Sequence, residues 1–222
     1  MSGELQTNLG YTFERHGLLR NAVTHTSFAH EQKLNPLDSN ERLEFLGDAV
    51  IELCISDMLY HKYPDLAEGE LTRKRASLVC ESSLAALARS IKLGKFLLLG
   101  QGEAREGGRE KDSILSDAFE SVIGAMYLDG GMEETLHVIK RLFEPLLDAP
   151  QEKDSKSTLQ EILQKNGDET ATYEIISEEG PPHQRIFTAN AIHKGKVLGT
   201  GTGTSKKAAE QEAAYMALKS LR

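Results

Sequence analysis

Acidic side chains recur at helical intervals in the segment Asn40-Glu-Arg-Leu-Glu-Phe-Leu-Gly-Asp-Ala-Val50. Glu41, Glu44 and Asp48 stand at positions i, i+3 and i+7, which a helix of about 3.6 residues per turn places on one face. Apolar residues that we expect to be buried surround them: Leu43, Phe45, Leu46, Val50 and Ile51. Like charges crowded beside a core are unfavourable unless a cation neutralises them, and a hard divalent metal is the obvious candidate.

A second pair of acids, Asp117 and Glu120, is spaced i and i+3 on another apolar helical pattern. Two helices that each offer close carboxylates can meet in one oxygen-only metal site. There Mg²⁺ would activate a water and stabilise the charge of a phosphoryl transfer. The alternative is that acids at helical spacing form only a solvated face. The apolar residues among Glu41, Glu44 and Asp48 argue against that alternative on the first helix.

Other catalytic and metal-binding patterns are weaker. Cys54 and Cys80 lie in apolar helical patterns, which predicts reduced, buried thiols and no disulfide or zinc site. The seven histidines show no H-E-x-x-H or H-x-H spacing. A Ser-His-acid arrangement with Ser27 and His25 is disfavoured, because both are expected on an apolar helix as packing or capping groups. A metal would therefore be held by oxygen.

The net charge of −8 argues at first against a nucleic-acid partner, but its distribution matters more. Residues 154–222 carry nine basic and nine acidic side chains, which leaves 17 basic and 25 acidic side chains in residues 1–153. The acid excess thus lies with the carboxylate clusters. No apolar run approaches the roughly 20 residues needed to span a bilayer, and the first residues do not resemble a secretory signal, so we expect no membrane partner and a cytoplasmic location.

The apolar periodicity predicts two domains of different class. We expect an all-α domain over residues 1–150, a linker over 151–156 and a small α+β domain over 157–222. The first domain should contain helices near 18–30, 39–62, 69–90, 112–129 and 132–147, and no strand. The glycine-rich segment 100–111 is expected to be an exposed, mobile loop.

Strand patterns appear only after the linker. A helix from Ser157 to about Lys165 precedes runs typical of strands at 172–177, 184–193 and 196–201. The alanine-rich segment 206–221 predicts a closing helix. The expected order is α-β-β-β-α.

The string Asn40–Asp48 resembles the signature of ribonuclease III, the endonucleases that cut double-stranded RNA. Segments 23–27, 68–73 and 112–120 follow it in the order found in that family, and the C-terminal unit resembles the family's double-stranded-RNA-binding domain. The resemblance covers nearly the whole chain. It implies a Mg²⁺-dependent hydrolase with no small-molecule organic cofactor. Mn²⁺ is a possible substitute, because the same oxygen ligands suit it.

The resemblance also assigns roles by position. It places metal ligands at Glu44, Asp117 and Glu120, and catalytic acids at Asp48 and Glu120. Glu41 and Glu68 match acids that line the RNA-binding valley or shape the dimer.

Since cutting both strands needs two centres, the resemblance implies a homodimer. The expected products carry 5′-phosphate and 3′-hydroxyl ends with short 3′ overhangs. The expected substrates are precursors of ribosomal and transfer RNA and structured messenger RNAs.

RNA contacts are implied on both helices and one loop of the second domain, since duplex RNA is read mainly by shape and phosphates. The matching positions are Ser157, Gln160, Gln164, His183, Ser205, Lys206 and Lys207. The family's Asp-Pro-Lys-Thr is Asp154-Ser-Lys-Ser157 here, which retains a hydroxyl. For the two lysines, an ordinary solvated helix start is the alternative.

Two other functions compete with the nuclease reading. One is a catalytically silent duplex-RNA-binding regulator, disfavoured because all four central acids are present. The other is a metalloenzyme acting on a small phosphate ester, disfavoured because the glycine-rich tract lacks a Gly-Lys-Ser/Thr ending.

Overall fold

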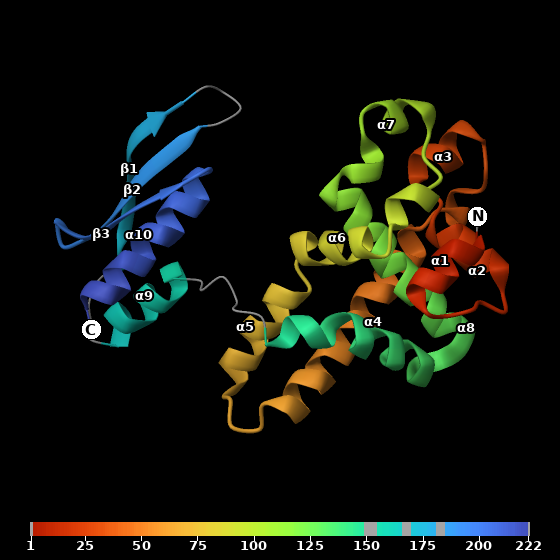
Figure 1. Ribbon diagram of the computed structural model, residues 1–222, viewed down its shortest axis with the longest axis horizontal. Coiled ribbons are helices and arrows are strands. Elements are labelled where there is room, and N and C mark those ends of the chain that lie inside the picture. Colours follow the sequence, from red (N-terminus) through yellow and green to blue (C-terminus); the bar gives the residue numbers. More distant parts are fainter. Residues whose placement is uncertain (1, 149–154, 166–169, 181–184, 222) are drawn as a thin grey trace. The chain divides into compact units, whose positions relative to one another are not determined.

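The computed structural model describes residues 2–148, 155–165, 170–180 and 185–221 (Figure 1). Contacts divide the chain into two compact units, Met1–Ala149 and Pro150–Arg222, each with its own hydrophobic core. No helix in the described ranges is long and apolar enough to span a membrane.

The first unit is helical, as predicted (Figure 1). Its α-helices are α1 (Ser2–Leu9), α2 (His16–Ala22), α3 (Thr26–Glu31), α4 (Glu41–Lys62), α5 (Glu68–Leu78), α6 (Glu81–Ser90), α7 (Gln101–Arg105) and α8 (Asp112–Leu147). Its 3₁₀ turns are η1 (Pro36–Asp38), η2 (Leu93–Phe96) and η3 (Gly108–Glu110). The β-structure described in this unit is one isolated bridge between Thr24 and Leu98.

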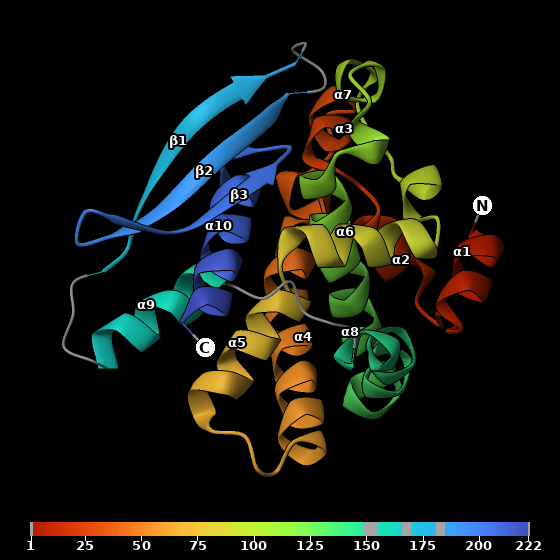
Figure 2. The same cartoon turned by 60° about the vertical axis from the view of Figure 1, so that its left-hand side comes forward.

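Helices α4 and α8 pack along each other at the centre of this unit (Figure 2). Two glycines bring their backbones into contact. A Cβ on Gly47 would lie 1.8 Å from the carbonyl oxygen of Glu120, and one on Gly124 would lie 2.2 Å from that of Leu43. No larger residue fits at either position, so the glycines draw together the turns that carry the acids.

Helix α8 includes both predicted segments, 112–129 and 132–147, on either side of a break. At the break, Gly131 has φ 80° and ψ −176°. Glycine adopts this backbone conformation readily because it has no Cβ. The predicted break at the glycine pair is therefore present, although the helix resumes directly beyond it.

Two other predicted helices are each divided. Segment 18–30 is split between α2 and α3, and segment 69–90 between α5 and α6. The residues before α3 and α6, His25 and Cys80, have extended backbones with ψ of 151° and 155°. Because the apolar periodicity continues across both breaks, the sequence does not show where one helix ends and the next begins. Helix α1 was not predicted.

The expectation of a loop at 100–111 is wrong, although most of this segment is exposed as predicted. This segment forms α7 and η3. The Glu31 carboxylate accepts a hydrogen bond from the Gln101 N–H at 2.7 Å, and the Arg109 guanidinium donates to the carbonyls of Gly94 and Leu97, each at 2.8 Å. Long-range partners, which composition does not reveal, fold the glycine-rich segment.

Two burial predictions are also wrong. Cys54 is buried and free, but Cys80 is exposed because it lies at the turn before α6. Phe45 is 83% exposed, since its side of α4 is not covered by the rest of its own unit.

The second unit has the predicted α-β-β-β-α order. Its elements are α9 (Ser155–Lys165), β1 (Thr172–Glu179), β2 (Ile186–His193), β3 (Lys196–Gly203) and α10 (Lys206–Ser220). The strands form an antiparallel sheet in the order β1-β2-β3. Leu159 and Leu163 of α9 join alanines of β2 and α10 in a small core.

Alternate residues of β3 are glycines that lie against α10. A Cβ on Gly199, Gly201 or Gly203 would come within 2.1–2.5 Å of the α10 backbone. The facing helix residues are small and fully buried: Ala209, Ala213 and Ala217. The Gly-Thr-Gly-Thr-Gly pattern therefore serves close packing of a helix on a sheet.

Candidate metal centre and nucleic-acid interface

Three carboxylates from two helices meet where α4 contacts α8. Glu44 comes from α4, and Asp117 and Glu120 come from α8. One oxygen from each lies within 4.8 Å of the others, and all three side chains are partly buried. The spacing follows from the helices, because residues i and i+3 share a face of α8 and the glycine contact brings Glu44 opposite them. The arrangement offers oxygen ligands only.

Glu120 carries the largest electrostatic cost in this cluster. Burial, followed by the charges of Asp48, Glu44 and Asp117, raises its pKa from 4.5 to about 8. Each neighbouring anion makes it harder to ionise a carboxyl group that is already partly removed from water. A cation placed among these oxygens would relieve the repulsion.

The other two carboxylates are shifted in the same direction. Burial and then the charges of Asp117, Glu41 and Asp48 raise the pKa of Glu44. Burial also raises the pKa of Asp117, against a hydrogen bond from Ser116 that lowers it. All three groups therefore favour a positively charged partner.

The remaining predicted acids lie outside the three-carboxylate cluster. Asp48 is exposed on α4, and its charge acts on both Glu44 and Glu120. Glu41 is exposed one turn before Glu44, 3.5 Å from the Ser39 hydroxyl. Glu68 is exposed at the start of α5, where it accepts a hydrogen bond from Thr72 at 3.0 Å.

Buried polar groups hold the helices in register below the cluster. The Ser121 hydroxyl is buried and lies 2.8 Å from the carbonyl oxygen of Asp117 and 3.1 Å from that of Asn40. Asn40 is itself buried and directly precedes α4. This contact ties the beginning of α4 to the turn of α8 that carries Asp117.

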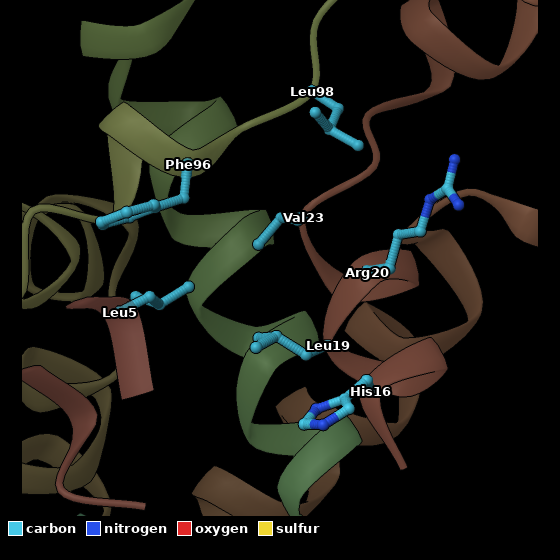
Figure 3. A pocket seen from close by; sticks show the side chains of 7 residues that line it. All are labelled: Leu5, His16, Leu19, Arg20, Val23, Phe96 and Leu98. Atoms are coloured by element: carbon cyan, nitrogen blue, oxygen red, sulfur yellow. The ribbon is translucent and has the colours of Figure 1, made fainter. Parts of the chain in front are cut away.

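A separate cavity of about 310 Å³ in the same unit is unsuited to this chemistry (Figure 3). Its lining is mainly apolar and contains no acid: Leu5, His16, Leu19, Arg20, Val23, Phe96 and Leu98. Its lining residues offer no carboxylate for a metal ion, so this cavity is not part of the candidate metal centre.

The predicted RNA-contacting residues occupy the two helices of the second unit. Gln160 and Gln164 are exposed, one turn apart on α9, and Ser157 is half-buried on the same helix. Lys206 and Lys207 are exposed in the first turn of α10. His183 lies outside the described residues.

Ser205 has a structural role that is independent of RNA. It precedes α10, and its hydroxyl accepts a hydrogen bond from the Ala208 N–H at 3.1 Å. This N-cap satisfies one of the otherwise unpaired amides at the start of the helix and fixes the direction in which the helix begins.

Sequence reasoning missed the glycines that bring the three carboxylates together. Gly47 and Gly124 both interrupt apolar helices, where glycine costs about 1 kcal/mol relative to alanine. A glycine that is present despite this cost can indicate a close helix contact, and this is how the sequence could have revealed it. The expected capping role of His25 is confirmed, because its Nδ1 accepts a hydrogen bond from the Ser27 N–H at 3.2 Å.

Comparisons with known families match both units. Residues 15–146 match the family model described as ribonuclease-III-like, and residues 155–221 match the double-stranded RNA binding motif. The matched ranges contain the carboxylate cluster and the lysine-bearing helix, respectively.

Similar proteins extend the match to nearly the whole chain. A ribonuclease 3 of Pelotomaculum thermopropionicum is 49% identical over 218 residues, covering 96% of this chain and 90% of that protein. A ribonuclease 3 of Listeria innocua is 46% identical over 221 residues, covering 98% of this chain and 96% of that protein. A crystal structure of the ribonuclease III nuclease domain from Campylobacter jejuni is 43% identical with a TM-score of 0.61, covering 68% of this chain and 99% of that domain.

A helical nuclease unit with a carboxylate cluster, followed by a double-stranded-RNA-binding unit, defines an endoribonuclease of double-stranded RNA. The chain belongs to the ribonuclease III family. It is accordingly a hydrolase.

Proposed function

We propose that Glu44, Asp117 and Glu120 bind Mg²⁺ and that this ion is required for cleavage of duplex RNA. The observation that carries the proposal is the convergence of three partly buried carboxylates, whose oxygens lie within 4.8 Å of one another. Hard oxygen ligands suit Mg²⁺, and Mn²⁺ as a substitute. The donor set contains no sulfur or imidazole.

The raised pKa values support a fit to a divalent cation. Burial and like charges work against ionisation of all three groups, so bound positive charge would stabilise the ionised set. When bound, such an ion would orient phosphate oxygens and activate a water for hydrolysis. Asp48 and Glu120 act as the catalytic acids beside it. The expected products carry 5′-phosphate and 3′-hydroxyl ends with short 3′ overhangs.

The chain acts as a homodimer in this proposal. The described residues contain one such carboxylate cluster, which serves one strand, so cutting both strands uses two chains. The exposed apolar face of α4, with Phe45 at 83%, Leu53 at 58% and Tyr60 at 70% exposure, supports such an association. Glu41 and Glu68 line the RNA valley or the dimer contact.

The RNA-binding unit, from about residue 157 onward, grips the duplex through both of its helices. Exposed Gln160 and Gln164 suit the polar minor groove, and exposed Lys206 and Lys207 suit phosphates. Ser157, His183 and Ser205 complete this surface. The substrates are precursors of ribosomal and transfer RNA and structured messenger RNAs, cut in the cytoplasm.

Replacing Glu120 with glutamine tests the proposal. Glu120→Gln keeps the size of the side chain but removes a metal ligand, so cleavage of a perfect RNA duplex in Mg²⁺ should fall by at least about 10³-fold. Duplex binding by the second unit should stay within about twofold. Cleavage is measured by product length on a gel, and binding by fluorescence anisotropy.

Glu133→Gln is the matched control, because Glu133 is exposed on the same helix. It should cut at the normal rate. Retained cutting by Glu120→Gln would refute the assignment of the metal ligands. Loss of binding as well as cutting would show that the variant disturbs more than the metal centre.

A further inference from the structure

The imidazole of His25 is locked in one tautomer by its neighbours. Its Nδ1 accepts a hydrogen bond from the Ser27 N–H at 3.2 Å and lies 2.8 Å from the Ser27 hydroxyl. That hydroxyl oxygen accepts the Gly100 N–H at 2.9 Å, which leaves its own proton for Nδ1. From this pattern we assign the proton of the neutral ring to Nε2. His25 therefore presents one N–H donor on its far side.

His25 lines a wide, open surface cavity of about 650 Å³ beside α3 and α7. The other lining residues are Thr26, Ser27, His30, Glu31, Gly102 and Glu103. Most of these residues are polar or charged and offer hydrogen-bonding groups, whereas mainly apolar residues line the cavity of Figure 3.

Both acids of this cavity already have partners within the protein. Glu31 accepts the Gln101 N–H at 2.7 Å, and Glu103 pairs with Lys111 at 2.6 Å. Among the residues that the structure describes, none accepts a hydrogen bond from Nε2 of His25. The cavity thus contains an available donor, while its negative charges are partly compensated.

The backbone next to His25 is hydrogen-bonded to the start of α4, close to the carboxylate cluster. The carbonyl of Thr24 accepts the Asn40 N–H at 2.8 Å, and Asn40 directly precedes α4. The Ser121 hydroxyl lies 3.1 Å from the Asn40 carbonyl oxygen and 2.8 Å from that of Asp117. The cavity therefore lies beside the same junction of α4 and α8 that carries the carboxylates.

We propose that the cavity receives the sugar-phosphate backbone of the RNA strand being cut, next to the reacting phosphate, and that His25 donates a hydrogen bond from Nε2 to a phosphate oxygen there. Ser27 acts as a positioning residue, because it fixes the tautomer. The inference rests on the proposed function, since it assumes that RNA is cut at the carboxylate cluster.

The test replaces His25 with serine and scans the substrate phosphates. Serine at position 25 can still cap α3 by accepting the Ser27 N–H, but it lacks the N–H donor. Because hydrogen bonds to charged groups contribute about 1.5–3 kcal/mol, His25→Ser should lower kcat/KM for a short duplex by about tenfold to a hundredfold. The thermal midpoint should not change.

A set of duplexes with a single methylphosphonate identifies the contact. Replacing the contacted phosphate should slow the wild-type protein by a similar factor, yet have little further effect on His25→Ser, because the two changes remove the same interaction. His30→Ser, a matched change in the same cavity, should still respond to that methylphosphonate. If His25→Ser fails to fold, His25→Thr takes its place in the scan, because threonine retains a capping hydroxyl and also lacks an N–H donor.

The outcomes separate the two hypotheses. Fully additive effects of His25→Ser and every methylphosphonate would overturn the phosphate contact. Normal cleavage by His25→Ser would also overturn the phosphate contact. If Glu120→Gln is inactive in the same assay, the metal-centre proposal still stands. Normal cleavage by Glu120→Gln would instead refute the proposed function.

Discussion

In both the nuclease unit and the RNA-binding unit, glycines allow two elements to pack closely. The charged groups beside these contacts have opposite signs. In the nuclease unit, Gly47 and Gly124 let two helices touch, and the contact assembles partly buried carboxylates. In the RNA-binding unit, three glycines of β3 let α10 lie close to the sheet, and the lysines at the start of that helix remain exposed. In the proposed function, the crowded acids of the first unit serve cleavage and the accessible lysines of the second unit serve RNA binding.

The acidic and basic side chains are distributed unequally between the two units. Residues 1–153 hold 25 acidic and 17 basic side chains, whereas residues 154–222 hold nine of each. A net charge of −8 is therefore compatible with an RNA substrate, because the phosphates of RNA interact more strongly with the local charges of each unit than with the net charge of the chain. The following predictions test this contrast.

The largest expected effect comes from closing the gap between α4 and α8. In Gly47→Ala, the new Cβ would lie 1.8 Å from the Glu120 carbonyl oxygen, so the helices must separate. We expect a loss of about 3 kcal/mol or more in the free energy of unfolding, together with loss of cleavage. Denaturant unfolding and the duplex assay measure these effects.

Gly69→Ala is the control for this change, because Gly69 is helical and a Cβ there meets nothing within 4 Å. It should be neutral or slightly stabilising. An equally small effect of Gly47→Ala would show that the glycine contact is not what assembles the carboxylates.

An intermediate effect is expected at the start of α10. Replacing both Lys206 and Lys207 with alanine should weaken duplex binding by about tenfold to a hundredfold and reduce the slope of log K against log salt by up to about two. The same double change at exposed Lys196 and Lys219 is the control. A salt slope that only the control pair alters would place the RNA on another face of this unit.

The smallest effect, a change in stability with pH, is the most specific to the nuclease unit. The pKa of Glu120 is raised to about 8, so the folded protein holds its proton after the unfolded chain, with a pKa near 4.5, has released it. Stability of the metal-free protein should therefore fall as pH rises from 4.5 to 8. Glu120→Gln should remove that fall, with a gain of about 1–2 kcal/mol at pH 8 and none below pH 4.5.

Thermal unfolding in a chelator across this pH range measures the gain. Adding Mg²⁺ should then stabilise the wild-type protein more than Glu120→Gln. If the stabilities of the two proteins change with pH in parallel, the neighbouring acids do not raise the pKa of Glu120 in solution.

Much of the architecture was predictable because it depends on neighbours in sequence. Apolar periodicity located α4 and both parts of α8, and alternation with turn residues located the three strands. The predictions failed where a distant partner decides the outcome. Glu31 and Arg109 order the glycine-rich segment, and the extended backbone at His25 and Cys80 divides helices whose apolar pattern is continuous.

The sequence by itself determined the order of the elements, the shared helix faces of the acids and the resemblance that nominated Glu44, Asp117 and Glu120. Local periodicity and composition are enough for the first two features, because they depend on residues within a few turns, whereas the three ligands were nominated by the family resemblance alone. Only the tertiary structure decided that carboxylates from α4 and α8 converge, that Phe45 is exposed and that the pKa of Glu120 rises to about 8. Burial and charge act through space, so they are set by which helices touch, and here two glycines set how closely.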